Sequence, residues 1–283
     1  MSRATHSDLL SVRSRRAWRL TRKYGFAAGA SLYLFSLGFL RERNRTLINS
    51  ICQHFGYTDR EVALPSVELH DLVPDCGAIR ICAPEVVEGN VTLLELVAIN
   101  KLVSHLSPRR LFEIGTFDGR TTLNLAVNSP EGAEVFTLDL PRTDLAATAL
   151  PVEPSERIYI EKDESGARYR GSGYESKITQ LYGDSALFDF SPFRGSIDFV
   201  FIDGSHAYEY VLTDSRNALR MLSGTGGIIL WHDYGGWDGV TRALNELYHG
   251  QSEFGGLRRL AGTSLALLQC AGGSPLAAGD RLG

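Results

Sequence analysis

The sequence predicts an α/β fold built on a doubly wound, mostly parallel sheet of seven strands, preceded by a helical N-terminal extension. Two observations support this prediction. Short apolar runs alternate with helical patterns from residue 92 to residue 247, which is the order of a parallel sheet covered by helices on both faces. A glycine-rich turn, Gly115 to Gly119, joins the first such run to a helix, as in folds that bind a ligand at the carboxyl ends of their strands.

Residues 1–60 are predicted to be a basic, helical region of their own. Residues 1–45 carry ten Lys or Arg against two acidic residues, whereas the whole chain has a net charge of −4. Within this region the segment Tyr24–Leu40 is uncharged and has basic residues on both sides. Three roles remain open for it: packing on protein, contact with anionic headgroups at a membrane surface through residues 15–45, or a span at the lower limit of about 17–25 residues.

A connector and then a regular domain follow. The connector, residues 61–90, contains three prolines and is expected to be irregular, with a short strand at 78–82. A capping box of Thr92 and Glu95 predicts the start of a helix that ends before Pro108. Within the domain at 91–270, the expected strands are 110–114, 134–138, 197–202 and 227–231, the expected helices are 121–127, 208–222 and 240–247, and 177–182 is a strand or a helix. Residues 141–173 are expected to be irregular, 255–260 and 264–269 to form a hairpin that adds an antiparallel edge strand, and 271–283 to be a loose tail.

Composition narrows the function. The four cysteines lack C-x-x-C spacing, so reduced thiols in a cytoplasmic protein are expected, with a Cys76–Cys82 bridge left open. The region after residue 45 is acidic and has no basic stripe, so no nucleic-acid partner is expected.

Polar residues recur where successive predicted strands end. They are Glu113 and the glycine turn, Asp139, Asp184 with Ser185, Asp203 with His206, and His232 with Asp233. Each acid alone could simply cap the next helix. Their recurrence at one edge of a parallel sheet predicts a ligand site, and a carboxylate at Asp139 can accept both hydroxyls of a ribose.

Taken together over residues 92–269, these motifs resemble class I S-adenosylmethionine-dependent methyltransferases. The branch they are most similar to is that of sugar and macrolide O-methyltransferases, through Phe201-Ile-Asp-Gly-Ser-His206 and Gly226-Gly-Ile-Ile-Leu-Trp-His-Asp-Tyr234. The resemblance implies the following cofactor contacts: Glu113, Gly115, Thr116 and Gly119 at the methionine end, Asp139 at the ribose, and Asp184 with Ser185 at the adenine.

The same resemblance implies methyl transfer to a hydroxyl of a small molecule, such as a sugar. Asp203, His232 and Asp233 would hold a divalent metal (Mg, Mn or another), and Asp203, His206 and His232 are the expected catalytic residues. In related metal-dependent O-methyltransferases these ligands are oxygens, so the imidazole of His232 favours a borderline metal over Mg²⁺. It also leaves open a metal-free reaction in which His232 or His206 is the base.

Other interpretations stay open at this point. A nicotinamide-dependent oxidoreductase could use a similar sheet, although the chain lacks G-x-G-x-x-G. A non-catalytic, membrane-tethered protein could bind S-adenosylmethionine, and the chain could form a homo-oligomer. The stretch Arg168–Tyr174, with glycines at 171 and 173, is either a lid in which Arg170 meets an anionic group or an exposed loop.

Overall fold

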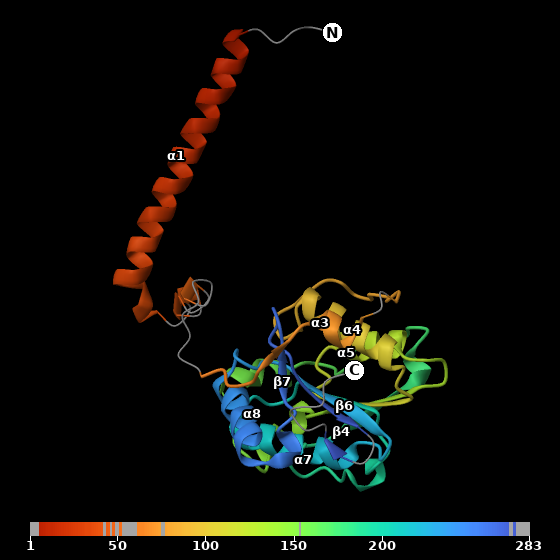
Figure 1. The fold of residues 1–283 in the computed structure, drawn as a ribbon. Helices are drawn as coiled ribbons and strands as arrows, with labels where there is room; N and C mark the ends of the chain where they lie inside the picture. The colour runs from red at the N-terminus through yellow and green to blue at the C-terminus, as the bar shows by residue number, and fades with distance from the viewer. Residues whose placement is uncertain are drawn as a thin grey trace. The chain divides into compact units, whose positions relative to one another are not determined.

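The computed structural model divides the chain into two compact units, Met1–Asp59 and Arg60–Gly283 (Figure 1). The residues that the structure describes are 6–41, 44–45, 47–48, 51–52, 61–74, 77–152, 154–271 and 274–275.

The N-terminal unit is dominated by one helix, α1, at His6–Ser36. The uncharged segment is helical as far as Ser36. The chain then turns through a 3₁₀ helix, η1, at Gly38–Leu40, and Asn44 Nδ2 donates to the Gly38 carbonyl oxygen at 2.9 Å. Among the residues that can be described, no helix is both long enough and apolar enough to cross a bilayer.

The second unit is built on one mixed sheet with the strand order β1-β7-β8-β6-β5-β2-β3-β4, and β9 pairs with β8. The strands are β1 Ser66–Val67, β2 Arg110–Ile114, β3 Glu134–Asp139, β4 Ile178–Tyr182, β5 Phe199–Ile202, β6 Gly226–Trp231, β7 Arg258–Leu260, β8 Ala266–Ala271 and β9 Ser274–Pro275. All pairings among strands β2, β3, β4, β5 and β6 are parallel, whereas β8 is antiparallel to both β6 and β7. The predicted fold class is confirmed, and β1 and β9 are additions to the seven expected strands.

Helices cover both faces of this sheet, because both faces of its central strands are apolar. One hydrophobic cluster includes Phe112 and Val200 and is completed by α7 (Tyr208–Met221) and α8 (Asp238–Gly250). The other includes Leu111 and Phe199 and is completed by α4 (Leu93–Leu106) and α5 (Arg120–Asn128). Neighbouring residues of one strand thus enter opposite clusters, as the alternation of side chains along a strand requires.

Several element predictions need correction. The hairpin strand β8 is not an edge strand, since it lies between β6 and β7, and β7 in turn pairs with β1. The undecided segment at 177–182 is a strand, β4. The irregular stretch 141–173 contains short helices, namely η2 Arg142–Ala147, η3 Pro154–Glu156 and α6 Arg157–Ile160. The remaining short helices are α3 Leu69–Leu72, η4 Glu175–Lys177, η5 Ser191–Phe193 and η6 Ser252–Phe254.

The expected strand at 78–82 is absent for a clear physical reason. Its backbone groups bond to asparagine side chains instead of to another strand. Asn128 Oδ1 accepts from the Arg80 backbone N–H and Asn124 Oδ1 from the Cys82 N–H, while Asn100 Nδ2 donates to the Arg80 carbonyl oxygen. Cys82 is a free thiol, and Cys76 lies outside the described residues.

Candidate active site

The residues predicted to act together leave the sheet at one edge. The register pairs Ile114 with both Leu138 and Ile202, and Ile202 with Trp231, so four parallel strands end at the same level. The residues that follow these ends are Gly115, Asp139, Asp203 and His232. In open α/β sheets this edge is where ligands bind.

A cavity of about 100 Å³ opens at this edge. Its walls include six residues predicted from the sequence: Gly115, Asp139, Asp184, Ser185, Asp203 and His206. Asp184 also caps its own turn, because its carboxylate accepts from the backbone N–H groups of Ala186 at 2.9 Å and Ala149 at 2.7 Å.

The glycine turn is shaped by close contact with the end of β5. Gly115 has φ +100°, and a Cβ built there would lie 2.1 Å from the Asp203 carbonyl oxygen. Only glycine therefore allows the two strand ends to meet. Phe117, in the same turn, adopts a left-handed φ of +49°, which is unfavourable for a bulky residue and is typical of functional sites.

Three predicted cofactor residues do not line this cavity. Glu113 is fully buried, and its carboxyl group accepts hydrogen bonds from the hydroxyls of Thr122 and Thr137 behind the turn. Burial raises the pKa of Glu113 to about 8 against the effect of these hydrogen bonds. Thr116 is buried too, with its hydroxyl 2.7 Å from that of Thr137, and Gly119 begins α5 as its N-cap.

The connection from β3 to β4 crosses the cavity and contributes walls that sequence reasoning missed. We call residues 154–165 of this connection the strap. Lys162 Nζ lies 2.7 Å from Asp139 Oδ2, and Ser165 donates to the same oxygen, so both occupy the carboxylate predicted to bind ribose. Pockets for drug-sized ligands measure roughly 300–1,000 Å³, so the strap holds this site in a closed form.

The stretch predicted as a lid, Arg168–Tyr174, lines neither this cavity nor the neighbouring one. Arg168 Nε donates to Asp118 at 2.6 Å, Tyr169 is buried, and Arg170 pairs with Glu164 at 2.5 Å. These contacts fix the stretch beside the glycine turn, and the strap takes the covering position instead.

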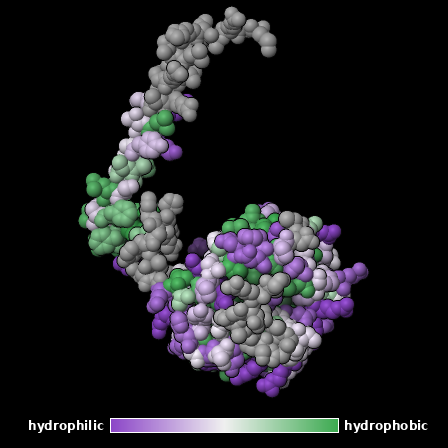
Figure 2. Space-filling model, in the orientation of Figure 1, coloured by the Kyte–Doolittle hydropathy of each residue, from purple (hydrophilic) through white to green (hydrophobic). Residues whose placement is uncertain are grey.

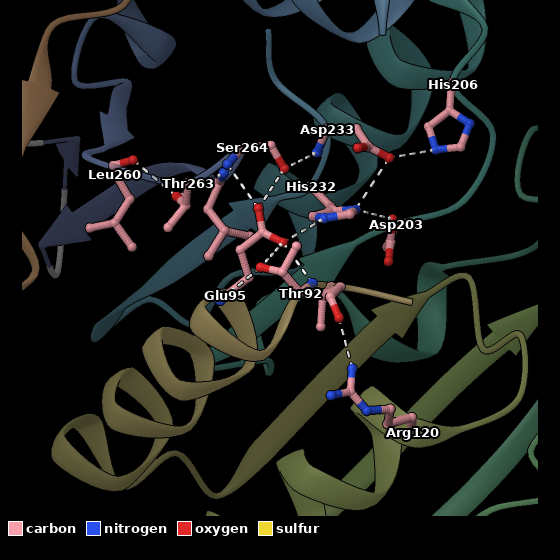
Figure 3. Close-up of polar contacts among 12 residues, drawn as sticks. Thr92, Glu95, Arg120, Asp203, His206, His232, Asp233, Leu260, Thr263 and Ser264 are labelled. Carbon is pink, nitrogen blue, oxygen red and sulfur yellow. Dashed lines mark hydrogen bonds and ion pairs between the residues drawn. The ribbon is translucent and has the colours of Figure 1, made fainter. Parts of the chain in front are cut away.

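Two histidines and three carboxylates, those of Glu95, Asp203 and Asp233, gather at the ends of β5 and β6 (Figure 3). A fourth carboxylate, that of Glu156, contacts His206. Among the predicted residues the separations are 3.0 Å from His232 Nδ1 to Asp203 Oδ1, 3.2 Å from the same nitrogen to Asp233 Oδ2, and 2.9 Å from His206 Nε2 to Asp233 Oδ2. Asp203, His232 and Asp233 each offer one atom within 4.8 Å of the others, so the predicted metal ligands do converge. Asp233 has a left-handed φ of +66°, which makes it the second strained residue of the site.

The remaining two carboxylates come from outside the predicted motifs. Glu95, from the first turn of α4, lies with Oε2 3.3 Å from His232 Nε2, and its other oxygen accepts from the N–H and hydroxyl of Ser264. Glu156, from the strap, lies 2.9 Å from His206 Nδ1 and accepts from the His206 backbone N–H. The sequence analysis missed Glu95 as a site residue because the capping box already explained it as part of a helix start. It missed Glu156 because no sequence pattern includes that residue.

These neighbours hold the protons on the histidines. Burial acts to lower the pKa of His206, but hydrogen bonds with Asp233 and Glu156 outweigh it and raise the pKa to about 9. The pKa of His232 is likewise raised well above its ordinary value, because the effect of Asp203, Asp233 and Glu95 exceeds that of burial. The surrounding carboxylates therefore favour the charged form of both imidazoles.

A second cavity, of about 180 Å³, adjoins the first and is bordered by four residues of the cluster, Asp203, His206, His232 and Asp233. Asp203, Gly204 and His206 line both cavities. The rings of Phe117 and Tyr159 meet edge to face at 5.7 Å and also border both. Trp237 forms a further wall, and its ring stacks on that of His206 with 4.2 Å between ring centres.

A glycine turn after the first central strand, a carboxylate after the second, and two cavities that share lining residues are the arrangement expected of a class I S-adenosylmethionine-dependent methyltransferase. Residues 112–234 match a family model described as a methyltransferase domain. Residues 112–234 therefore carry the features of a methyltransferase domain, in agreement with the prediction from the sequence.

Comparison with curated protein sequences finds no match. Several solved structures are similar to the chain. Cofactor-bound Rv0187 from MTB is 20% identical, with a TM-score of 0.45, over 65% of this chain and 83% of that one. The O-methyltransferase TomG from Streptomyces achromogenes, which is involved in tomaymycin synthesis, is 20% identical, with a TM-score of 0.44, over 63% and 80%. The O-methyltransferase from Bacillus cereus in complex with S-adenosylhomocysteine is 15% identical, with a TM-score of 0.42, over 66% and 83%. At these scores the likenesses carry no inference about the substrate.

Proposed function

We propose that this domain transfers the methyl group of S-adenosylmethionine to a hydroxyl oxygen of a small molecule, and that Asp203, His232 and Asp233 hold a divalent cation beside that oxygen. The observation that carries the proposal is the position of Asp203. It lines both cavities and is one of the predicted metal ligands, so the predicted cofactor site lies beside the charged cluster.

The residues around the first cavity fit an adenosyl group. The Asp139 carboxylate can accept hydrogen bonds from both hydroxyls of a ribose. Gly115 and Gly183 border the same cavity without side chains, which leaves room for a ligand against the backbone. Ser185 and the apolar walls Leu140 and Ile160 fit the adenine half.

The charge of the second cavity supports the cation. Four carboxylates surround only two imidazoles, so negative charge remains even when both histidines are protonated. The Glu95 carboxylate can accept a hydrogen bond from the N–H at His232 Nε2. When Nδ1 of His232 loses its proton, the lone pair on that nitrogen then faces Asp203 and Asp233. A histidine held in this way by a carboxylate is the usual arrangement at protein metal sites.

The reaction needs few groups. The acceptor oxygen forms a bond to the methyl carbon as the bond from that carbon to sulfur breaks, and the hydroxyl proton passes to the Asp203 carboxylate, which lines both cavities. A divalent cation held by Asp203, His232 and Asp233 would lower the pKa of the acceptor hydroxyl and so would favour this proton loss. The protein orients the acceptor and excludes water with Phe117, Tyr159 and Trp237, and their ring faces suit the C–H face of a sugar or another small ring.

The test is incubation of the full chain with S-adenosylmethionine bearing a deuterated methyl group and a fractionated small-molecule extract. Mass spectrometry should find a compound with the labelled methyl group on oxygen. Dialysis against a chelator should abolish this product, and Mn²⁺, Co²⁺ or Mg²⁺ should restore it. A methyl group on nitrogen or carbon contradicts the hydroxyl acceptor, and full activity after chelation contradicts the cation and assigns the base to His206 or His232.

Substitution separates the site from general charge effects. Asp233→Asn should lower turnover by about 10²-fold or more, since it removes one ligand and one partner of both histidines. Asp238→Asn makes the same change at an exposed position, paired only with Arg242 at 3.5 Å, and should leave turnover unchanged. Equal turnover in the two variants would remove Asp233 from the chemistry.

A further inference from the structure

The N-terminal unit carries the most exposed apolar side chains of the described residues. Phe26 is 79% exposed, Leu32 75% and Leu37 65%. Figure 2 shows this hydrophobic surface along the end of α1 that leads into the turn. Other large apolar side chains exposed in the same stretch are Trp18, Leu20, Tyr24, Tyr33, Phe35, Phe39 and Leu40. Large contiguous apolar surfaces of this kind mark sites of contact with protein or membrane.

The apolar side chains surround the helix and do not form one stripe. Phe26 and Phe35 are nine residues apart, which is two and a half turns at 3.6 residues per turn, so they point in opposite directions. A second copy or another protein packed along one face would leave the opposite face exposed. A medium that encloses the helix from all sides covers both faces, and the acyl region of a bilayer is such a medium.

Basic residues stand at both ends of this apolar segment. Arg19, Arg22 and Lys23 precede it, and Arg41 and Arg45 follow the turn. The guanidinium group of Arg22 lies over the ring of Trp18, with 4.7 Å between Arg22 Cζ and the ring centre. Tryptophan is a residue typical of the membrane–water interface. This charge is complementary to anionic headgroups, each Lys or Arg strengthening binding by roughly fivefold.

The length of the apolar helix limits how deep it can go. From Tyr24 to the helix end at Ser36 it rises about 20 Å at 1.5 Å per residue, less than the roughly 30 Å hydrocarbon core. The chain then turns at Gly38–Leu40, with Arg45 Nε donating to the Phe39 carbonyl oxygen at 3.0 Å. The apolar tip thus has basic residues on both sides of it, which keeps both chain ends on one side of a bilayer.

We propose that Trp18–Arg45 docks this methyltransferase on an anionic membrane surface, with the tip of α1 and its turn entering one leaflet and the basic residues on the headgroups. This inference is independent of the acceptor and of the cation. It places the enzyme at a surface where amphipathic or lipid-dissolved hydroxyl compounds are concentrated.

The test is co-sedimentation of the full chain with vesicles of phosphatidylcholine alone and of phosphatidylcholine with phosphatidylglycerol. Binding should be stronger to the anionic vesicles and should weaken as salt is raised. Phe35→Ser combined with Leu37→Ser should weaken binding by at least about tenfold, because both side chains leave the acyl region. The charge-reversed variant R19E/R22E/K23E should remove the preference for phosphatidylglycerol.

The matched control is Leu187→Ser, at a residue of the methyltransferase unit that is 69% exposed. It should bind vesicles like the unchanged protein, and circular dichroism should show the same thermal midpoint for all variants. No binding to either vesicle, or equal binding by the Phe35 and Leu37 variant, overturns the proposal. A stable dimer in light scattering that is lost in this variant, without vesicle binding, assigns the segment to a second copy instead.

Discussion

At the scale of single residues, Glu95 links the fold to the site. Its Oε2 accepts from the Thr92 backbone N–H at 2.8 Å and completes the capping box of α4. The same oxygen lies 3.3 Å from His232 Nε2, and Oε1 accepts from Ser264 at 2.8 Å. Burial acts to raise the pKa of Glu95. The hydrogen bond and positive charge of His232, together with the hydrogen bonds from Ser264, outweigh burial and hold this pKa well below its ordinary value, so the group is an anion. A helix start thereby fixes the orientation of a candidate metal ligand.

This arrangement predicts a specific effect of Glu95→Gln. Glutamine also forms capping boxes, so α4 should persist, but its amide presents no negative charge to His232. Affinity for Mn²⁺, measured by isothermal titration calorimetry, should fall about 10- to 100-fold, as it does when the carboxylate behind a metal-bound histidine is lost.

The control for Glu95→Gln is Thr92→Ala. It breaks the cap and costs about 1 kcal/mol of stability, yet leaves the contact of Glu95 with His232 in place. Its affinity for Mn²⁺ should match that of the unchanged protein. An equal loss in both variants would show that Glu95 acts only through the helix.

At the scale of elements, the strap joins the two halves of the site. Its Lys162 contacts Asp139 in the first cavity, and its Glu156 contacts His206, which borders the second. A ribose that binds Asp139 must compete with Lys162 and Ser165 for the same carboxylate. Because Lys162 and Ser165 already occupy this carboxylate, we expect the strap to move when the cofactor enters.

Hydrogen exchange should detect this motion. Without ligand, strap amides should exchange faster than those of β5, which is fully buried. S-Adenosylhomocysteine at about 100 times its Kd should slow strap exchange by roughly 100-fold if opening releases the ligand. Strap exchange that is unaffected by the ligand would mean that the cofactor binds without displacing the strap.

The sequence predicted elements best where periodicity and caps are local. Strand β2 has the predicted bounds, and the capping box of Thr92 and Glu95 is present. The strap could not be foreseen, since Glu156 and His206 are fifty residues apart and no periodic pattern connects them. The strand expected at 78–82 failed because asparagines of α4 and α5 satisfy its backbone, a tertiary effect that local propensity does not contain.

At the scale of the whole molecule, the predicted strand ends located the edge of the sheet where the polar residues lie, but they did not predict which way each side chain points. The alternation of strands and helices placed Asp139, Asp203 and Asp233 at one edge, and they lie there. The same reasoning put Glu113 against the cofactor, whereas its carboxyl group points behind the turn. The direction of a side chain at the end of a strand depends on the face of the sheet that its residue occupies. The sequence alone does not distinguish an acid that points into the site from one that is buried behind it.

Two such buried acids make the stability of the domain depend on pH. Burial raises the pKa of Glu113 to about 8 and that of Asp214 to about 7. No positively charged group is among the main influences on either pKa. In the unfolded chain both ionise near pH 4. Between about pH 4 and these values the folded state holds more protons than the unfolded state, so the contribution of each group to stability falls as pH rises, by up to about 1.4 kcal/mol per pH unit.

The prediction is tested with Glu113→Gln, because an amide cannot ionise but keeps the shape of the protonated acid. The free energy of unfolding, from urea titrations between pH 5 and 8, should shift in favour of the variant as pH rises. Groups with lowered pKa values act in the opposite direction, and the difference between variant and unchanged protein removes them. Asp238→Asn, at an exposed position, should give a curve parallel to that of the unchanged protein. If the curve of Glu113→Gln is also parallel, Glu113 ionises alike in both states and its burial behind the glycine turn does not hold its proton.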